Sequence, residues 1–347
     1  MTKLASIFGR GYAALEAEDL DSVQAAMAAA IEGGADENDA RLRYLEFMSG
    51  WLDEGTTEED IQELFDGAGD LLDSALELGD AVEAARIVLD LADILVSLGD
   101  ADDAEQALQA LSERDDLSPE AASEARLLRA QVLLDFHQDA EEALVALDGV
   151  HPGLHEDGGY VSLRAAVLAE LERVDEAVEL LEQAIARDDD TELRYQLGIM
   201  LREAGTHEAA LDQLLTVRAR DLATHEVDAA RPVPADEAED LRRHLEDMLD
   251  TLPEPVINRV AAAAIRVERW PSEAAVRDGC DPRTALAFEG QPAGDGDDDE
   301  GQVDALVLYR DAIVAQIESD EEIVEALALG LVEEFDRYFD LELIPGM

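Results

Sequence analysis

The chain has 347 residues, of which 85 are Asp or Glu and 25 are Lys or Arg, so its formal net charge is −60. Such a surface repels phosphate backbones and anionic lipid headgroups, so nucleic acids and membrane surfaces are excluded as expected partners. Hydrophobic residues make up 47% of the chain, too many for a solvated, disordered polymer, and we expect a folded protein.

The acidity is spread along the whole sequence, because residues 257–347 carry a net charge of −15 and the other 256 residues carry −45. Self-repulsion of this size destabilises a fold unless salt screens it, which indicates a protein of a salt-rich cytoplasm; a biased genome composition is the alternative. Residues 1–20 reach Glu16 without the apolar core of an export signal, and no apolar run is long enough to span a bilayer. Cys280 is the single cysteine, so an internal disulfide is excluded. We therefore expect a cytoplasmic protein.

The first 79 residues predict amphipathic helices. Two polar segments separate them, GGADEND at 33–39 and DEGTTEED at 53–60. Further along, four helical segments share one skeleton, in which a polar turn is followed by Ala with a large apolar residue four positions later. The pairs are Ala104 and Leu108, Ala140 and Leu144, Ala177 and Leu181, and Ala210 and Leu214, and the alanines are 36, 37 and 33 residues apart. A small residue lets two helices approach, and the apolar residue one turn later fills the contact between them.

The clearest copy of this pattern is residues 191–222, TELRYQLGIMLREAGTHEAALDQLLTVRARDL. It resembles a tetratricopeptide repeat, with Leu197 and Gly198 in the first helix, Gly205 in the turn, and Ala210 and Leu214 in the second helix. The resemblance extends over roughly residues 80–222. It implies an α-solenoid of helix pairs, with degenerate or capping repeats before residue 80 and a concave groove for a protein or peptide partner.

The helical pattern breaks at residues 223–236, where Pro232 and Pro234 disfavour helix. A helix is predicted at 237–251, strands at 265–270, 284–289 and 305–310, and helices at 311–318 and 320–339. We therefore predict a mainly α protein with a repeat domain at 1–222, a linker at 223–236 and a small α+β domain at 237–347.

The C-terminal part resembles the minimal zincin-like metallopeptidases. The resemblance rests on the runs VERWPSEAAVRDGCDPRTALAFEG (267–290) and ALVLYRDAI (305–313) and on the final helix, and it covers roughly residues 240–342. Proteins of this family use an HExxH helix, in which two His one turn apart hold Zn²⁺ and the Glu activates the bound water.

The resemblance aligns EEFDRYFDLE (333–342) with that helix. Glu333 then stands at the first His, Glu334 at the catalytic Glu, Arg337 at the second His, and Glu342 at a downstream acid. Because a guanidinium repels a dication, Arg337 is expected either to pair with Glu333 or Glu334, or to be solvated with them. No His follows His244 that could replace the missing ligands.

Other chemistry finds little support in the sequence. Glu333, Glu334 and Glu342 alone would suit Ca²⁺ or Mg²⁺ better than catalytic zinc, and the acidic loop at 294–301 lacks the Gly and Glu positions of an EF-hand. We therefore expect no catalytic residue, no bound metal and no cofactor. The predicted function is a non-catalytic interaction or scaffold protein, a pseudoenzyme in its C-terminal domain. The alternative is a zinc-dependent metallopeptidase with an unconventional metal site.

Overall fold

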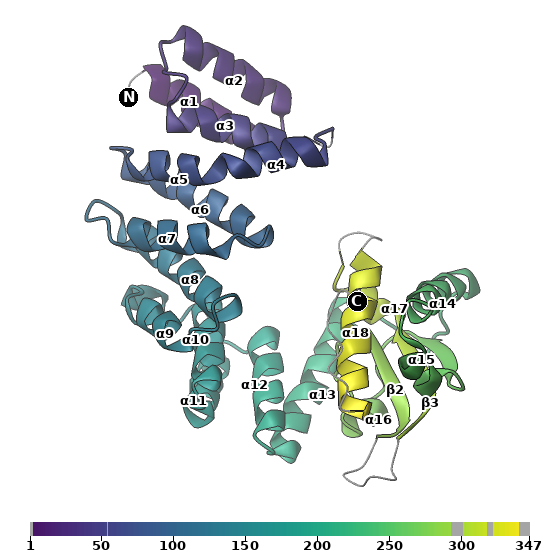
Figure 1. Ribbon diagram of the computed structural model, residues 1–347. Helices are drawn as coiled ribbons and strands as arrows, with labels where there is room; N and C mark the ends of the chain where they lie inside the picture. Colours follow the sequence, from purple (N-terminus) through teal and green to yellow (C-terminus); the bar gives the residue numbers. More distant parts are fainter. Residues whose placement is uncertain (1–2, 54, 293–300, 318–321, 340–347) are drawn as a thin grey trace. The chain divides into compact units, whose positions relative to one another are not determined.

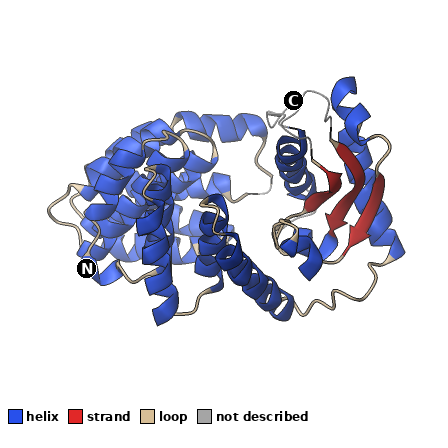
Figure 2. Ribbon diagram, turned by 90° about the horizontal axis from the view of Figure 1, so that it is seen from below, coloured by secondary structure: helices blue, strands red, loops and turns tan. Residues whose placement is uncertain are grey.

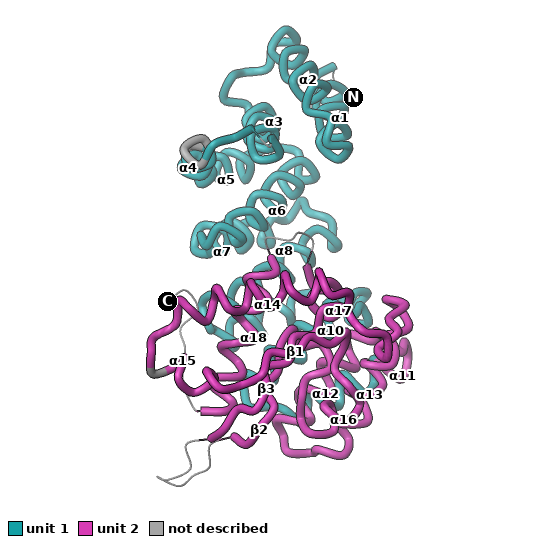
Figure 3. The backbone as a smooth tube through the Cα atoms, turned by 90° about the vertical axis from the view of Figure 1, so that its right-hand side faces the viewer, with its two compact units in different colours: residues 1–184 teal, residues 185–347 magenta. Residues whose placement is uncertain are grey.

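A computed structural model describes residues 3–53, 55–292, 301–317 and 322–339 of the chain. Its contacts divide the protein into two compact units, residues 1–184 and residues 185–347 (Figure 3). No described helix is both long enough and apolar enough to cross a membrane.

The first unit consists of helices, and no strand occurs in its described residues 3–53 and 55–184 (Figure 1). Its elements are α1 Lys3–Leu15, α2 Leu20–Glu32, α3 Ala40–Trp51, α4 Glu58–Asp66, α5 Ala68–Leu76, α6 Ala81–Ser97, α7 Ala101–Ser112, α8 Pro119–Asp135, α9 Ala140–Asp148, the 3₁₀ turn η1 Pro152–Leu154, α10 Gly158–Glu170 and α11 Val174–Arg187. The last of these crosses into the second unit. The predicted helical first half is confirmed.

Part of the acidity serves to start helices. Within the described residues, six helices begin after an Asp whose carboxylate accepts a hydrogen bond from a backbone N–H of the first turn: Asp19, Asp39, Asp80, Asp139, Asp157 and Asp190. Each such cap contributes about 1 kcal/mol to helix stability, because it satisfies an N–H that the helix itself leaves free.

The turns between paired helices repeat one backbone conformation. Gly99, Gln138, Glu172 and Gly205 each have a left-handed φ, of +87°, +53°, +59° and +75°. At three of these turns the following residue donates its N–H to the carbonyl five positions back, as Asp100 does to Leu95, which closes a Schellman-type helix end. An alanine five residues after each turn residue and a leucine nine residues after it are both buried: Ala104 and Leu108, Ala143 and Leu147, Ala177 and Leu181, Ala210 and Leu214.

The sequence alignment of the second copy was therefore wrong by three residues. Ala140 and Leu144, the predicted pair, are only half-buried, whereas Ala143 and Leu147 are fully buried. Alanine recurs every third residue in this helix, so the letters alone allow both alignments, and the turn geometry distinguishes them. The repeat alanines are then 39, 34 and 33 residues apart.

The second unit begins with the helix pair α12 Thr191–Glu203 and α13 His207–Thr224 and continues into a small α+β domain. That domain contains α14 Ala235–Leu249, α15 Glu254–Val260, β1 Ala264–Glu268, α16 Glu273–Arg277, β2 Leu286–Gln291, β3 Gln302–Tyr309, α17 Arg310–Val314 and α18 Glu322–Phe339. The sheet order is β1-β3-β2, with β1 parallel and β2 antiparallel to β3. The three predicted strands and the mainly α fold with a C-terminal α+β domain are confirmed.

Both faces of the sheet are covered by helices (Figure 2). Leu306 and Leu308 of β3 lie in one core with Leu245 of α14 and Phe335 of α18. Ala305, Val307 and Tyr309 face a second, smaller core that contains Trp270 and Cys280. This alternation along β3 is what two buried faces require.

The second unit starts earlier than the predicted domain boundary. Leu222 of α13 and Val227 pack against the core around Trp270, so the last helix pair belongs with the sheet. The boundaries at 222 and 236 stay predictions about sequence domains, drawn where the repeat pattern ends, and the compact unit begins at residue 185.

Candidate functional site

The final helix places the predicted site residues beside the sheet. Leu327, Leu331 and Phe335 of α18 are buried in the core with β2 and β3, and Tyr338 joins them at the end of the helix. Phe288 of β2 packs edge-on against Phe335, with ring centroids 5.2 Å apart. With this face fixed, Glu334 points toward β2 and is buried, while Glu333 and Arg337 remain partly exposed.

Arg337 pairs with Glu334, as the first of the two predicted alternatives states. The Arg337 Nη2 to Glu334 Oε2 distance is 2.5 Å, and the same carboxylate oxygen accepts the backbone N–H of Phe288 at 2.6 Å. Burial raises the pKa of Glu334, and the guanidinium and the backbone N–H act in the opposite direction. One oxygen of Glu334 therefore holds the strand and the arginine together.

The free edge of β2 is occupied by side chains of the same chain. The Tyr309 N–H donates to the Ala285 carbonyl, which fixes the hydrogen-bonded pairs of this antiparallel ladder. Because bonded and non-bonded pairs alternate, the N–H and C=O groups of Leu286 and Phe288 point away from β3. Glu334 accepts from Phe288, and the Tyr338 hydroxyl donates to the Phe288 carbonyl at 2.8 Å. The Thr284 hydroxyl, in turn, donates to the Leu286 carbonyl at 2.6 Å. An extended peptide could add to this edge only by displacing these bonds.

Glu333 has a different environment from Glu334. Its pKa is raised by partial burial and by the charges of Asp281 and Glu334, while the charge of Arg202 opposes the shift. Glu342, the predicted downstream acid, lies outside the described residues, as does nearly all of the acidic loop at 294–301.

Cys280 is buried in the smaller core, together with Trp270 and Tyr309. Burial raises the pKa of its thiol to about 12, and the carboxylates of Glu334 and Asp281 add to the effect. A thiol with this pKa is protonated at neutral pH and is a poor nucleophile.

His155, His207 and His225 are each followed by a Glu in the sequence. His155 stacks on Tyr160 at 4.7 Å, His207 starts α13, and His225 stacks on Trp270 at 5.9 Å. In the described ranges, no group of three or more His, Cys, Asp or Glu side chains is arranged to hold a metal ion.

Two features of this region were missed by sequence reasoning. The sequence predicts no role for Tyr338, and its bond to Phe288 involves a backbone carbonyl that no residue pattern reveals. Asp281 and Arg283 belong to the CDPR run that carried the family resemblance, and the structure shows both in contact with the α12–α13 pair.

Comparison with known proteins agrees with this geometry. The sequence matches the tetratricopeptide repeat family over residues 171–257 and the zincin-like metallopeptidase family over residues 260–342. No curated protein matches the chain in sequence.

Two solved structures match the chain at low identity and with low TM-scores. A tetratricopeptide repeat protein from Parabacteroides merdae is 13% identical, with 74% of this chain and 96% of that chain covered and a TM-score of 0.45. The TPR2AB domain of yeast Sti1, in complex with pHSP90, is 17% identical, with 64% and 92% covered and a TM-score of 0.29. From the family matches and the fold together, the chain has a tetratricopeptide repeat region followed by a C-terminal domain of the zincin-like metallopeptidase family.

Proposed function

We propose that the protein is a non-catalytic interaction protein whose zincin-like domain no longer works as a peptidase. The observation that carries this proposal is the Arg337–Glu334 pair. Glu334 stands at the position of the general base in the family motif, and its buried carboxylate is bonded to a guanidinium and to a backbone N–H. A general base must instead reach a water or a substrate proton.

The charge at position 337 supports the same conclusion. Two His side chains one turn apart are what the family motif needs to hold zinc, and Glu333 and Arg337 stand at those positions. The permanent positive charge of Arg337 opposes a dication in its vicinity. The occupied edge of β2 adds a further obstacle, because it removes backbone groups that an extended substrate would use.

The binding function is assigned to the helical repeats. Solenoids of helix pairs present extended surfaces to polypeptides, and tetratricopeptide repeats are protein-interaction modules. We propose a protein or peptide partner in the groove of the repeats and a cytoplasmic location. The match to a metallopeptidase family supports one competing function, that of a zinc peptidase with an unconventional metal site.

Metal analysis of the purified full-length protein, combined with an unbiased peptide-cleavage assay at high salt, tests the proposal. We expect substoichiometric zinc and no chelator-sensitive cleavage. Stoichiometric zinc together with cleavage that a chelator abolishes would refute the non-catalytic function and establish the competing one.

A restored motif provides the matched control. The double substitution Glu333→His and Arg337→His recreates HExxH around Glu334, so it should bind zinc if the alignment with the family is right. The single substitution Glu333→His leaves Arg337 in place and should not bind zinc. Equal zinc affinity in the wild type and the double variant would show that the alignment is wrong.

A further inference from the structure

The segment at residues 270–284 of the zincin-like domain lies against the last helix pair, α12–α13, within the second unit. Three kinds of contact meet there: a multiply bonded arginine, buried hydrogen bonds to the backbone, and an apolar cluster. None of them involves the final helix.

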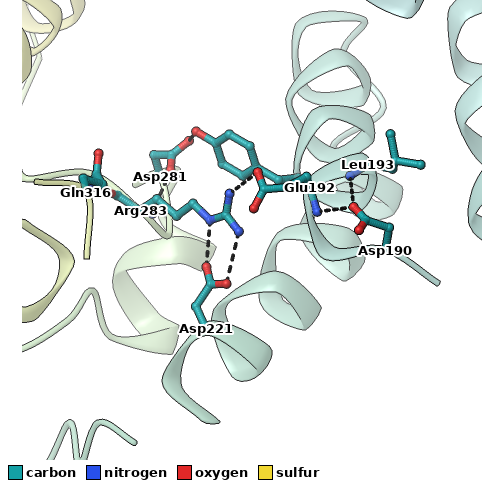
Figure 4. Close-up of polar contacts among 8 residues, drawn as sticks. Asp190, Glu192, Leu193, Asp221, Asp281, Arg283 and Gln316 are labelled. Carbon is teal, nitrogen blue, oxygen red and sulfur yellow. Dashed lines mark hydrogen bonds and ion pairs between the residues drawn. The ribbon is translucent and has the colours of Figure 1, made fainter. Parts of the chain in front are cut away.

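Arg283 is the centre of the polar contacts (Figure 4). Its Nε and Nη2 bond both carboxylate oxygens of Asp221 in α13 at 2.7 and 3.1 Å, and Nη1 bonds Glu192 in α12 at 2.7 Å. The guanidinium also lies over the ring of Tyr195, 4.7 Å from its centroid. The Arg283–Asp221 ion pair is therefore bidentate, and its carboxylate is buried, since Asp221 is only 7% exposed.

Two further hydrogen bonds fix the same segment. The Tyr195 hydroxyl donates to Asp281 at 3.0 Å. The Nε of the buried Arg218 donates to the Pro271 carbonyl at 2.5 Å. The buried guanidinium of Arg218 thus holds the Pro271 carbonyl of the domain. Without this carbonyl, the buried charge of Arg218 would lower the stability of the fold.

The apolar contacts continue this surface. Leu222 and Val227 pack on the cluster that contains Trp270 and Tyr309, and the ring of His225 stacks on Trp270. The core below the sheet is therefore closed by residues at and after the end of α13.

We propose that the zincin-like domain serves as the structural cap of the last repeat. The α12–α13 pair and the sheet form one cooperative folding unit, and the domain holds α12 side chains such as Tyr195 in place. This role goes beyond the proposed binding function and holds whether or not the repeats have a partner. It also gives a domain without peptidase activity a reason to be retained, since terminal units of a solenoid need a cover.

Native-state hydrogen exchange of the full-length protein tests the proposal without any substitution. Amides of Leu214 and Val217 in α13 should open together with those of Val307 and Leu308 in β3, with equal protection. If the α13 amides open at least about 10-fold more readily than the β3 amides, the proposal is overturned.

Substitutions at the contact provide the second test. Arg283→Met leaves Asp221 buried without its partner and should lower the protection of α13 by at least about 100-fold, the lower bound expected when one member of a buried pair is removed. Arg283→Lys keeps the charge but not the bidentate geometry, so this variant should fold and show an intermediate loss of α13 protection. The matched control is Arg173→Met, because Arg173 also forms a bidentate pair, with both bonds to Glu176 at 2.7 Å, but this pair is exposed and local.

The control variant should leave α13 protection unchanged within about twofold, as is usual for exposed pairs. Unchanged α13 protection in both Arg283 variants would overturn the proposal, as would a loss confined to residues 281–284.

Discussion

Removal of the guanidinium at position 337 gives the most direct test of the candidate site. Arg337→Met would leave the Glu334 carboxylate with only the Phe288 N–H as a partner among the residues that the structure describes. The Glu334 side chain is 11% exposed and that of Arg337 is 39% exposed. Breaking a fully buried pair costs about 3–5 kcal/mol, and because Arg337 is partly in water we expect a loss of about 2 kcal/mol. In a unit of this size that loss lowers the melting temperature by about 4–8 °C.

The pH dependence of this loss distinguishes the ion pair from lost packing. Burial already raises the pKa of Glu334, and without Arg337 that pKa rises further. Above its folded-state pKa, Glu334 is a charge without a counter-ion in the variant, and below it the group is neutral and needs none. The destabilisation should therefore shrink as the pH falls toward the ordinary value of 4.5.

Denaturant unfolding of the second unit, followed at about pH 5 and pH 8 in high salt, measures both quantities. Arg243→Met is the matched control, because Arg243 forms an exposed pair with Asp240 one turn away on α14. That variant should change stability by less than about 0.5 kcal/mol at either pH. A loss below about 0.5 kcal/mol for Arg337→Met, or one equal at both pH values, would refute the assigned role of the pair.

Three further tests follow from the backbone and from burial. Glu172→Gly should stabilise the protein by about 1 kcal/mol in a denaturant melt, because Glu172 has φ +59°, while Gly205→Ala at the equivalent turn should destabilise it by a similar amount; a loss for Glu172→Gly would contradict the turn assignment. Gly290→Ala should cost more than about 2 kcal/mol, since its new Cβ would lie 2.0 Å from the Gln302 carbonyl oxygen, whereas Gly279→Ala meets no atom within 4 Å and should cost about 1 kcal/mol; equal losses would argue against the bulge geometry. Burial raises the pKa of Asp90 in the first unit, so its contribution to stability falls as the pH rises above 3.8 through the folded-state pKa; Asp90→Asn should flatten that part of the stability curve, and an unchanged curve would show that Asp90 does not titrate there.

The elements of the fold could be predicted because hydrophobic periodicity and turn residues are local signals. The strands predicted at 265–270, 284–289 and 305–310 overlap β1, β2 and β3, whose ends differ from the prediction by at most three residues. The second repeat could not be aligned by the same means. Its alanines recur every third residue, and only the left-handed turn at Gln138 identifies Ala143 as the buried one.

The candidate site was predictable in its side chains and not in its backbone contacts. The spacing of Glu334 and Arg337 puts them one turn apart, so their pairing follows from helix geometry. The bonds from α18 to Phe288 depend on how a helix lies against a strand edge more than 40 residues away in the sequence. Contacts of Arg283 with Asp221 and Glu192 are of the same kind, because they join segments separated by 62 and 91 residues.

The single cysteine has a practical consequence. Cys280 is buried at the junction between the α13 end and the sheet, and its protonated thiol is shielded in the native state. Reaction with a maleimide or a disulfide reagent therefore requires the surrounding core to open. Because no other cysteine is present, the rate at which the wild-type protein is labelled reports directly on the opening of this core. The measurement can be made in concentrated salt and inside cells.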